Sequence, residues 1–463
     1  MITRRTLWAA ALLPALLAGC ASVSPDGGVA RVNELTQPRI GQPVGKTDAS
    51  SRTRVGELLA QPLSAEAAMQ IALLNNPRVQ AALADLGIAD ADLAQAGTLR
   101  NPRFSFGRTS GAGSVEIDRS VLFDLGGLLT LPMRKAIEQR RFEQAQLQAA
   151  LQVVRLAADT RRAWFDAVAA QQTLAFFEQA ALAAQASAEL AQQMAKVGNW
   201  NKLDEAREQV FHAEVAAQLV QARHNQLARR EALARAMGLS GSQLAFSLPD
   251  RLPPLPGQIA PPKDVESLAL QQRLDVQAAK LETEFTARSL GLTRTTRVVN
   301  VLELGYQNRS ESGAPRADGY EVELSLPLFD WGQARVRRAE SIYMGSLQRA
   351  ADTALRAQSQ VREASSLRSA QYDVARRYRD EIVPLRKRMS DEMLLRYNGM
   401  LASVFELLSD ARAQIASVSA SIAAQRDFWI ADSELQFAIH GGASVPLSPS
   451  ASPVQPAAAA AAH

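Results

Sequence analysis

The sequence contains few of the residues that build disulfides, metal sites or aromatic cores. It has one cysteine and four histidines in 463 residues, and aromatic residues make up 5% of it. A single cysteine excludes any disulfide within the chain. The four histidines have no metal-binding spacing, and neither a glycine-rich phosphate loop nor a nucleophile elbow is present. We therefore expect no enzyme, no bound metal and no cofactor.

Basic and acidic residues are nearly balanced, with 51 Lys and Arg against 47 Asp and Glu. Two of the basic residues, Arg4 and Arg5, lie in the first twenty. A nearly neutral chain lacks the basic character of nucleic-acid-binding proteins, so we expect no nucleic-acid partner. Long apolar runs are also missing. Beyond residue 20, none approaches the ~20 residues of a transmembrane helix.

Residues 1–20 have the layout of an export signal. Arg4 and Arg5 precede an apolar run at 7–17 that is too short to span a bilayer, and the segment ends in Leu-Ala-Gly-Cys at Cys20. This ending predicts a bacterial lipoprotein signal, in which Cys20 carries a lipid such as palmitate and becomes the mature N-terminus. The alternatives are an ordinary signal peptide with an incidental cysteine and, from Arg4-Arg5, the twin-arginine export route.

The rest of the chain is duplicated. The segment Val79–Ala82 recurs as Val276–Ala279, roughly 200 residues later, and similar offsets relate other landmarks in the same order. Such a period is far longer than the 20–50 residues of solenoid repeats. We predict an extended tether at 21–60, a first repeat at 61–247, a proline-rich linker at 248–263, a second repeat at 264–440 and a disordered Pro/Ala tail at 441–463.

The pattern of each repeat predicts a helix, two strands and a long helical hairpin. For the first repeat we predict helices at 64–96, 133–197 and 202–237 and strands at 103–107 and 114–122. For the second we predict helices at 264–290, 333–396 and 401–437 and strands at 298–306 and 320–326. No Gly or Pro interrupts 133–197, which as one helix is roughly 100 Å long. Pro384 is expected to kink or open its counterpart.

Helix packing leaves a clear pattern in both hairpins. Apolar residues alternate at spacings of three and four, which specifies coiled-coil packing. In the first hairpin the positions are Leu203, Ala206, Val210, Ala213, Ala217, Val220, His224 and Leu227, of which His224 is polar. In the second they are Val404, Leu408, Ala411, Ile415, Val418 and Ile422. So long a hairpin needs other long helices beside it, and therefore other subunits.

The strands alternate polar and apolar side chains, most clearly at 103–107, 114–117 and 320–326. The third strand, at 298–306, alternates only in part. In water, alternation fits a half-buried hairpin, and in an exported protein it also fits the wall of a membrane barrel. Four strands cannot close a barrel, and open edges are not tolerated in lipid, so the membrane alternative requires an oligomer.

Together these features resemble the outer-membrane efflux protein family, the TolC-like channels. The resemblance covers roughly residues 60–440. It rests on the duplicated order, on Ser325-Leu326-Pro327-Leu328-Phe329-Asp330-Trp331-Gly332, and on the turns at 196–200 and 396–401. It implies a mainly α-helical fold with a small β part. Duplicated helical hairpins would form a trimeric α-barrel, and four strands per chain would contribute to a 12-stranded β-barrel in the outer membrane.

The resemblance also implies sites and partners. The periplasmic tips would contact an adaptor (membrane fusion) protein, which connects the homotrimer to an inner-membrane transporter of the resistance-nodulation-division type. The tip residues are Val197, Gly198, Asn199, Trp200, Asn398, Gly399 and Met400. The candidates for a constriction at the entrance are Asp204, Glu406 and Asp410. Helix capping is the alternative role for Asp204 and Glu406.

We therefore expect a lipid-anchored protein of the outer membrane with a large periplasmic part. Its function would be that of the channel component of a tripartite efflux system, which passively exports substrates delivered by the pump. The alternative is a periplasmic coiled-coil lipoprotein with a scaffolding role and no pore. The strands discriminate between the two, because a pore requires apolar residues on the same face of all four.

Overall fold

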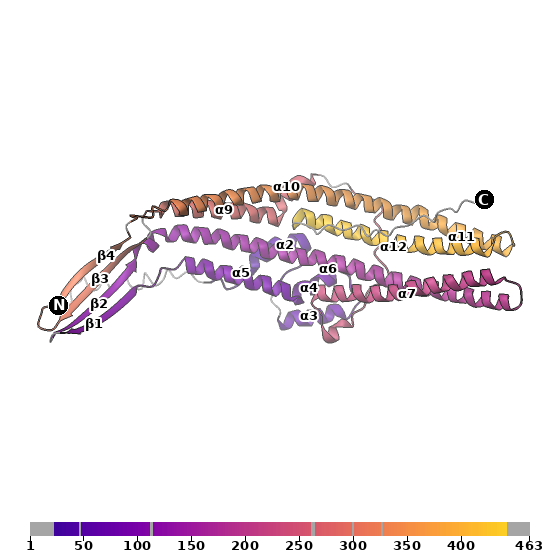
Figure 1. Cartoon of the computed structure of the whole chain (residues 1–463), viewed down its shortest axis with the longest axis horizontal. Helices are drawn as coiled ribbons and strands as arrows, with labels where there is room; N and C mark the ends of the chain where they lie inside the picture. The colour runs from indigo at the N-terminus through magenta and orange to yellow at the C-terminus, as the bar shows by residue number, and fades with distance from the viewer. Residues whose placement is uncertain are drawn as a thin grey trace.

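The computed structural model describes residues 23–45, 48–111, 114–260, 264–298, 301–325 and 327–441. They form one elongated body, with a sheet at one end, hairpin tips at the other and long helices between them (Figure 1). Cys20 with its predicted lipid, and residues 442–463 of the predicted tail, lie outside the described residues. Among the described helices, none is both long enough and apolar enough to cross a membrane.

Two copies of one element order follow each other. The first comprises α4 (Ala65–Asn75), α5 (Pro77–Ala96), β1 (Arg103–Gly111), β2 (Ser114–Asp124), α6 (Leu125–Lys196) and α7 (Lys202–Met237). The second comprises α8 (Val265–Gln272), α9 (Leu274–Thr295), β3 (Leu302–Glu311), β4 (Ala317–Leu324), α10 (Gln333–Arg377), α11 (Val383–Asn398) and α12 (Val404–His440). Two further helices, α2 (Val29–Ile40) and α3 (Ala49–Leu59), precede the first copy, and a short 3-10 helix, η1 (Gly241–Leu244), follows it.

The long helices agree well with the sequence. α7 has the predicted bounds, and α6 extends the predicted helix toward the sheet to reach 72 residues, roughly 110 Å. Pro384 acts as expected, because the second long helix opens into a π-helical turn, η2 (Tyr378–Ile382), just before it. Proline has no N–H to offer the carbonyl four residues earlier, so the regular hydrogen-bond pattern cannot continue there.

The predictions of single helices at 64–96 and 264–290 were wrong, because each is broken once. Asn76 separates α4 from α5 and Arg273 separates α8 from α9, both with extended backbone. Pro77 accounts for the first break, since the residue before a proline disfavours the helical conformation. Ser64 is the N-cap of α4, with its side chain accepting a hydrogen bond from the Ala67 N–H.

Asn76 and Arg273, the residues at the two breaks, each cap the C-terminal end of the last helix of the same repeat. The Asn76 side-chain amide donates to the Ala236 carbonyl at 2.7 Å, in the last turn of α7. The Arg273 guanidinium donates to the Ala438 carbonyl at 3.3 Å, in the last turn of α12, and pairs with Asp275 at 2.7 Å. Asn76 is 4% exposed and Arg273 1%. These bonds satisfy carbonyls that a helix end leaves unpaired.

The prediction of an extended tether at 21–60 was also wrong, because α2 and α3 lie in this segment. A capping box between Asp48 and Ser51 starts α3, and both helices bury apolar side chains, including Val32 and Val55. Richness in Gly, Ser and Pro suggested an open chain. The capping box of α3, together with the packing of α2 on α6 and of α3 on α4, outweighs that composition.

The predicted seam of α7 is exposed in the single chain. All eight of its positions, from Leu203 to Leu227, lie on the surface. α7 packs on α6 and α12 through another stripe, in which Phe211 and Val215 meet Leu408. The seam predicted on α12 is buried or half-buried. Within the described part of the chain, the α7 seam therefore has no helix packed along it.

We predict that Asn76→Ala weakens the joint between α4, α5 and the end of α7. The carbonyls of Arg235 and Ala236 would lose the Asn76 amide as a donor, although the Arg235 carbonyl still accepts from the Gly238 N–H. Loss of these bonds and of the N-cap of α5 should lower the free energy of unfolding by about 2 kcal/mol. Amide hydrogen exchange in the last turn of α7 should accelerate. Asn225→Ala, in the middle of the same helix, serves as the control and should leave that turn unchanged. Equal exchange in both variants would contradict the capping role.

Candidate functional site at the sheet and the hairpin tips

The four strands form one antiparallel sheet in the order β1-β2-β3-β4 (Figure 1). Residues directly opposite each other share a face, so the register assigns each side chain to one of two faces. The apolar face carries Phe104, Phe106, Val115, Ile117, Val121, Phe123, Leu302, Leu304, Tyr306, Tyr320, Val322 and Leu324. The polar residues on the same face are Arg108, Ser110, Arg119, Asn308, Ser310 and Asp318.

The opposite, polar face is rich in carboxylates. It carries Arg103, Ser105, Thr109, Ser114, Glu116, Asp118, Ser120, Asp124, Glu303, Gln307, Arg309, Glu311, Glu321 and Glu323. Arg103 pairs with Glu303 across the sheet, and Arg309 lies 2.8 Å from Asp118. Acidic groups outnumber these two arginines, so this face has a negative potential.

The third strand resolves the ambiguity left by the sequence. β3 begins at Leu302, later than predicted, and it places Leu302, Leu304 and Tyr306 on the apolar face. Alternation fails at the neighbouring apolar residues Val301 and Leu302, and the strand begins only at Leu302; residues 299 and 300 lie outside the described residues. All four strands therefore contribute apolar residues to one face, as a wall between lipid and water would require.

The first hairpin tip joins α6 to α7. Gly198 has a left-handed φ of 78°, and the Asn199 N–H donates to the Met194 carbonyl at 2.9 Å. This is the Schellman arrangement, in which a left-handed residue closes a helix end. Val197 is exposed at the turn, whereas Trp200 is half-buried.

The second tip differs from the prediction in one residue. Gly399 has an ordinary φ of −82°, and Met400 adopts the left-handed φ of 59°. The Leu401 N–H donates to the Arg396 carbonyl at 2.8 Å, which is the same Schellman bond as in the first tip. Met400 is therefore the structural counterpart of Gly198. Its side chain is 95% exposed, so a strained backbone holds an apolar side chain outward at the tip.

Two of the three acidic candidates have local capping partners. The Asn201 amide donates to Asp204 at 2.7 Å, and Arg207 lies 3.1 Å from Asp204. Glu406 forms a capping box with Ser403, whose backbone N–H donates to the carboxylate at 2.7 Å. This hydrogen bond lowers the pKa of Glu406. Glu406 thus takes part in the cap of α12, whereas Asp204 bonds to Asn201, the residue whose side chain caps α7.

The third candidate, Asp410, is only 8% exposed, and its Oδ2 has no hydrogen-bond partner among the described residues. A second buried acid, Glu208, lies nearby along α7, is 1% exposed and accepts a hydrogen bond from Ser187 at 3.0 Å. Burial raises the pKa of Glu208, while Ser187 and Arg412 oppose the shift. The burial of Glu208 was not predicted from the sequence, because its position off the predicted seam gave no sign of it.

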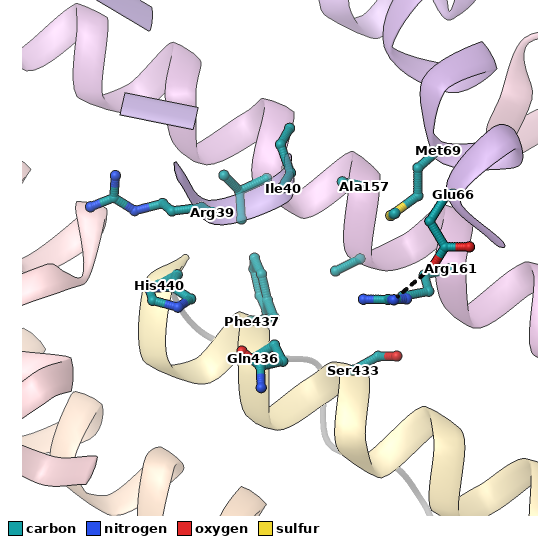
Figure 2. A pocket seen from close by; sticks show the side chains of 12 residues that line it. Arg39, Ile40, Glu66, Met69, Ala157, Arg161, Ser433, Gln436, Phe437 and His440 are labelled. Atoms are coloured by element: carbon teal, nitrogen blue, oxygen red, sulfur yellow. Dashed lines mark hydrogen bonds and ion pairs between the residues drawn. The ribbon is translucent and has the colours of Figure 1, made fainter. Parts of the chain in front are cut away.

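A small cavity of about 160 Å³ lies in the middle of the body, between α2, α4, α6 and α12 (Figure 2). Its lining combines apolar side chains, such as Met69 and Phe437, with an ion pair between Arg161 and Glu66 at 3.1 Å. His440 lies at its rim, and burial together with nearby Arg39 lowers the pKa of this imidazole. None of these residues was singled out from the sequence.

A repeated motif at the sheet–helix junctions was also missed. Leu122-Phe123-Asp124-Leu125-Gly126 recurs as Leu328-Phe329-Asp330-Trp331-Gly332. Both aspartates accept a backbone hydrogen bond just before a long helix, from Gly127 at 2.6 Å and from Gly332 at 2.8 Å. In the first copy the motif ends β2, whereas in the second it forms a loop beyond β4. Comparing the chain with itself at this offset would have found it.

We predict that the two tip glycines respond differently to alanine. Gly198→Ala should lower the stability of the first tip by about 1 kcal/mol, because a Cβ disfavours its left-handed backbone. Gly399→Ala should be nearly neutral, because its φ is ordinary and a Cβ there meets no atom closer than 3.5 Å. Amide exchange in the last turns of α6 and α11 measures both effects. A larger effect at Gly399 would contradict the assignment of Met400 as the left-handed residue.

We predict that Glu208 makes the tip bundle less stable as the pH rises. A carboxyl whose pKa is raised by folding keeps its proton longer in the folded state, so stability falls above its ordinary value of 4.5 until the raised value is passed. The difference in Tm between Glu208→Gln and the wild-type protein should therefore grow as the pH rises above 4.5. Glu189→Gln, on the surface of α6, is the control. A Glu208→Gln difference that does not change with pH would refute the prediction.

No family model matches the sequence. One curated relative is the cobalt-zinc-cadmium resistance protein CzcC of Cupriavidus metallidurans, which is 25% identical over 291 residues. The matched region covers 60% of this chain and 66% of the relative, just under two thirds of its length.

Solved structures resemble the chain over more of its length. The CmeC outer-membrane channel of Campylobacter jejuni has a TM-score of 0.72 at 15% identity, covering 89% of this chain and 92% of that one. The outer-membrane protein VceC of Vibrio cholerae has a TM-score of 0.69 at 16% identity, covering 82% and 96%. The resemblance inferred from the sequence is therefore confirmed at the level of the fold, and the chain has the fold of these outer-membrane channel proteins.

Proposed function

We propose that the protein is the channel component of a tripartite efflux system, through which substrates pass passively to the exterior. The observation that carries this proposal is the sheet with one apolar and one polar face, joined directly to the long helical hairpins. The apolar face suits the hydrocarbon of a bilayer and the polar face suits a water-filled passage. The shared fold with outer-membrane channels supports the same conclusion.

The functional unit would be a homotrimer. Within the described chain, β1 and β4 are the edges of the sheet, and unpaired strand edges are not tolerated in lipid. Three copies would supply twelve strands and close the barrel. The exposed seam of α7 supports the same assembly, because alternating spacings of three and four suit a neighbouring helix. The helices of three copies would then form the α-barrel across the periplasm.

The hairpin tips would contact the adaptor protein, which connects the channel to an inner-membrane transporter of the resistance-nodulation-division type. Exposed apolar side chains gather at both turns, and Met400 and Leu401 project from the second. Apolar anchors of this kind often dominate the affinity of a protein interface. The remaining tip residues, Val197, Gly198, Asn199, Trp200, Asn398 and Gly399, would shape the turns that present them.

At the entrance, Asp204 and Glu406 would form rings of negative charge, each with one carboxylate per subunit. Such rings favour cations at short range. Their capping bonds are compatible with this role, because they hold the carboxylates at fixed positions in the first turn of α7 and α12. Asp410, buried in the single chain, would reach the passage only after the hairpins part.

Anchoring to the outer membrane through a lipid on Cys20 belongs to the same proposal, as do the large periplasmic part and the contact with outer-membrane lipid. The name of CzcC associates that relative with resistance to cobalt, zinc and cadmium. Divalent metal cations are therefore the substrates we propose to test first.

We predict that the purified protein conducts ions as a trimer in a planar lipid bilayer. Val220→Glu should abolish both the trimer, measured by light scattering in detergent, and the conductance, because Val220 lies in the exposed seam. Val220→Leu keeps an apolar side chain there and should preserve both. A soluble monomer without conductance, obtained after removal of the lipid, would instead support the scaffolding alternative.

A further inference from the structure

The uninterrupted apolar part of the sheet is short. Counted from the end of the sheet that joins the helices, it has three rows of residues that lie opposite each other on neighbouring strands. The first row is Leu302 and Leu324, and the second is Phe123, Leu304 and Val322. The third row is Phe104, Val121, Tyr306 and Tyr320. Same-face rows along a strand are roughly 7 Å apart, so three rows span roughly 14 Å. The apolar band of a membrane barrel is ~25 Å tall. The sheet alone therefore supplies little more than half of that height.

The next row ends the band on the side away from the helices. It pairs Phe106 with polar side chains, and Asn308 accepts from Arg119 at 3.0 Å and donates to Asp318 at 2.6 Å. This hydrogen-bonded group suits a polar boundary. The missing height must therefore come from the other side, where the strands meet the long helices.

On that side, the loop between β4 and α10 exposes three large apolar residues. Phe329 is 99% exposed, and Leu328 and Trp331 are also exposed. The loop is held in place, because Asp330 accepts from the Gly332 N–H, and a Cβ on Gly332 would lie 2.9 Å from the Arg297 carbonyl oxygen. The backbone of this loop is therefore held in place, and its apolar side chains are not covered by other described residues.

The internal duplication indicates what this loop faces. Phe123, the counterpart of Phe329 in the first copy of the motif, lies on the apolar face of the sheet. The first copy also continues into exposed apolar residues, Leu128 and Leu129, at the start of α6. Apolar side chains therefore extend beyond the strands at both sheet–helix junctions, in continuity with the apolar face.

The chemistry of the junction matches a membrane–water interface. Trp is enriched at the headgroup level, where its ring meets lipid and its N–H meets water. Farther along the helices lie Lys135, Arg337 and Arg338, which are exposed and form no ion pair among the described residues. Basic side chains at this depth suit phospholipid headgroups.

We propose that Leu328, Phe329 and Trp331, together with Leu128 and Leu129, form an interfacial anchor that inserts into the periplasmic leaflet of the outer membrane and completes the apolar band. The occupant of this surface is phospholipid. The inference rests on the proposed function, because the sheet must itself lie in the membrane. It adds residues outside the strands to the part of the protein that contacts lipid.

Fluorescence quenching tests the anchor. The full chain would be reconstituted into bilayers of phosphatidylethanolamine and phosphatidylglycerol with brominated acyl chains. The emission of Trp331 is obtained as the difference between the wild-type protein and Trp331→Phe, because the other tryptophans, Trp8, Trp164, Trp200 and Trp429, are the same in both. We expect bromine near the headgroups to quench most of this emission, and bromine near the chain ends to quench it less.

A second reporter separates this inference from the proposed function. Tyr320→Trp in the Trp331→Phe background places a fluorophore on the apolar face of the sheet. Quenching at both positions supports the anchor. Quenching at 320 without quenching at 331 overturns the anchor, for example because a neighbouring subunit covers the loop, and leaves the channel intact. Absence of quenching at both positions overturns the anchor and the membrane position of the sheet together.

Discussion

A long helix can bury only the stripes of its surface that have a neighbour, and this constraint governs the whole molecule. α6 is far too long to fold into a compact core, so the chain lays α7, α9 and α12 along it in series. One copy has too few helices to cover every stripe. The seam of α7 stays exposed for this reason, and so do the outer edges of the sheet. A single chain therefore leaves apolar helix surface and strand edges uncovered.

Features that depend on local chemistry could be predicted from the sequence. The bounds of α7 followed from its regular spacing and the flanking glycines, and the opening at Pro384 followed from the missing N–H. Features that depend on tertiary contacts could not. The break at Arg273 has no proline beside it, and it exists because the guanidinium reaches the end of α12. The helices within 21–60 pack against α6 and α4, which composition alone does not reveal.

The candidate site shows the same division. Alternation predicted the two faces of the sheet, but the true start of β3 depended on pairing with its neighbours. Glycine suggested that residue 399 closes the second tip, whereas the left-handed position falls on Met400. The burial of Glu208 arises between hairpins and leaves no mark in a single helix. By contrast, the motif shared by the two sheet–helix junctions is visible in the sequence but was not recognised as a repeat.

The two helix-break caps have diverged in their chemistry. In the first repeat, the neutral amide of Asn76 caps the end of the last helix. In the second repeat, the buried Arg273 guanidinium does so while paired with the Asp275 carboxylate. In the trimer that we propose, six similar repeats would surround the axis, with two chemically different joints in alternation. Salt acts more on a charged joint than on a neutral one. The two kinds of joint would therefore respond differently to ionic strength.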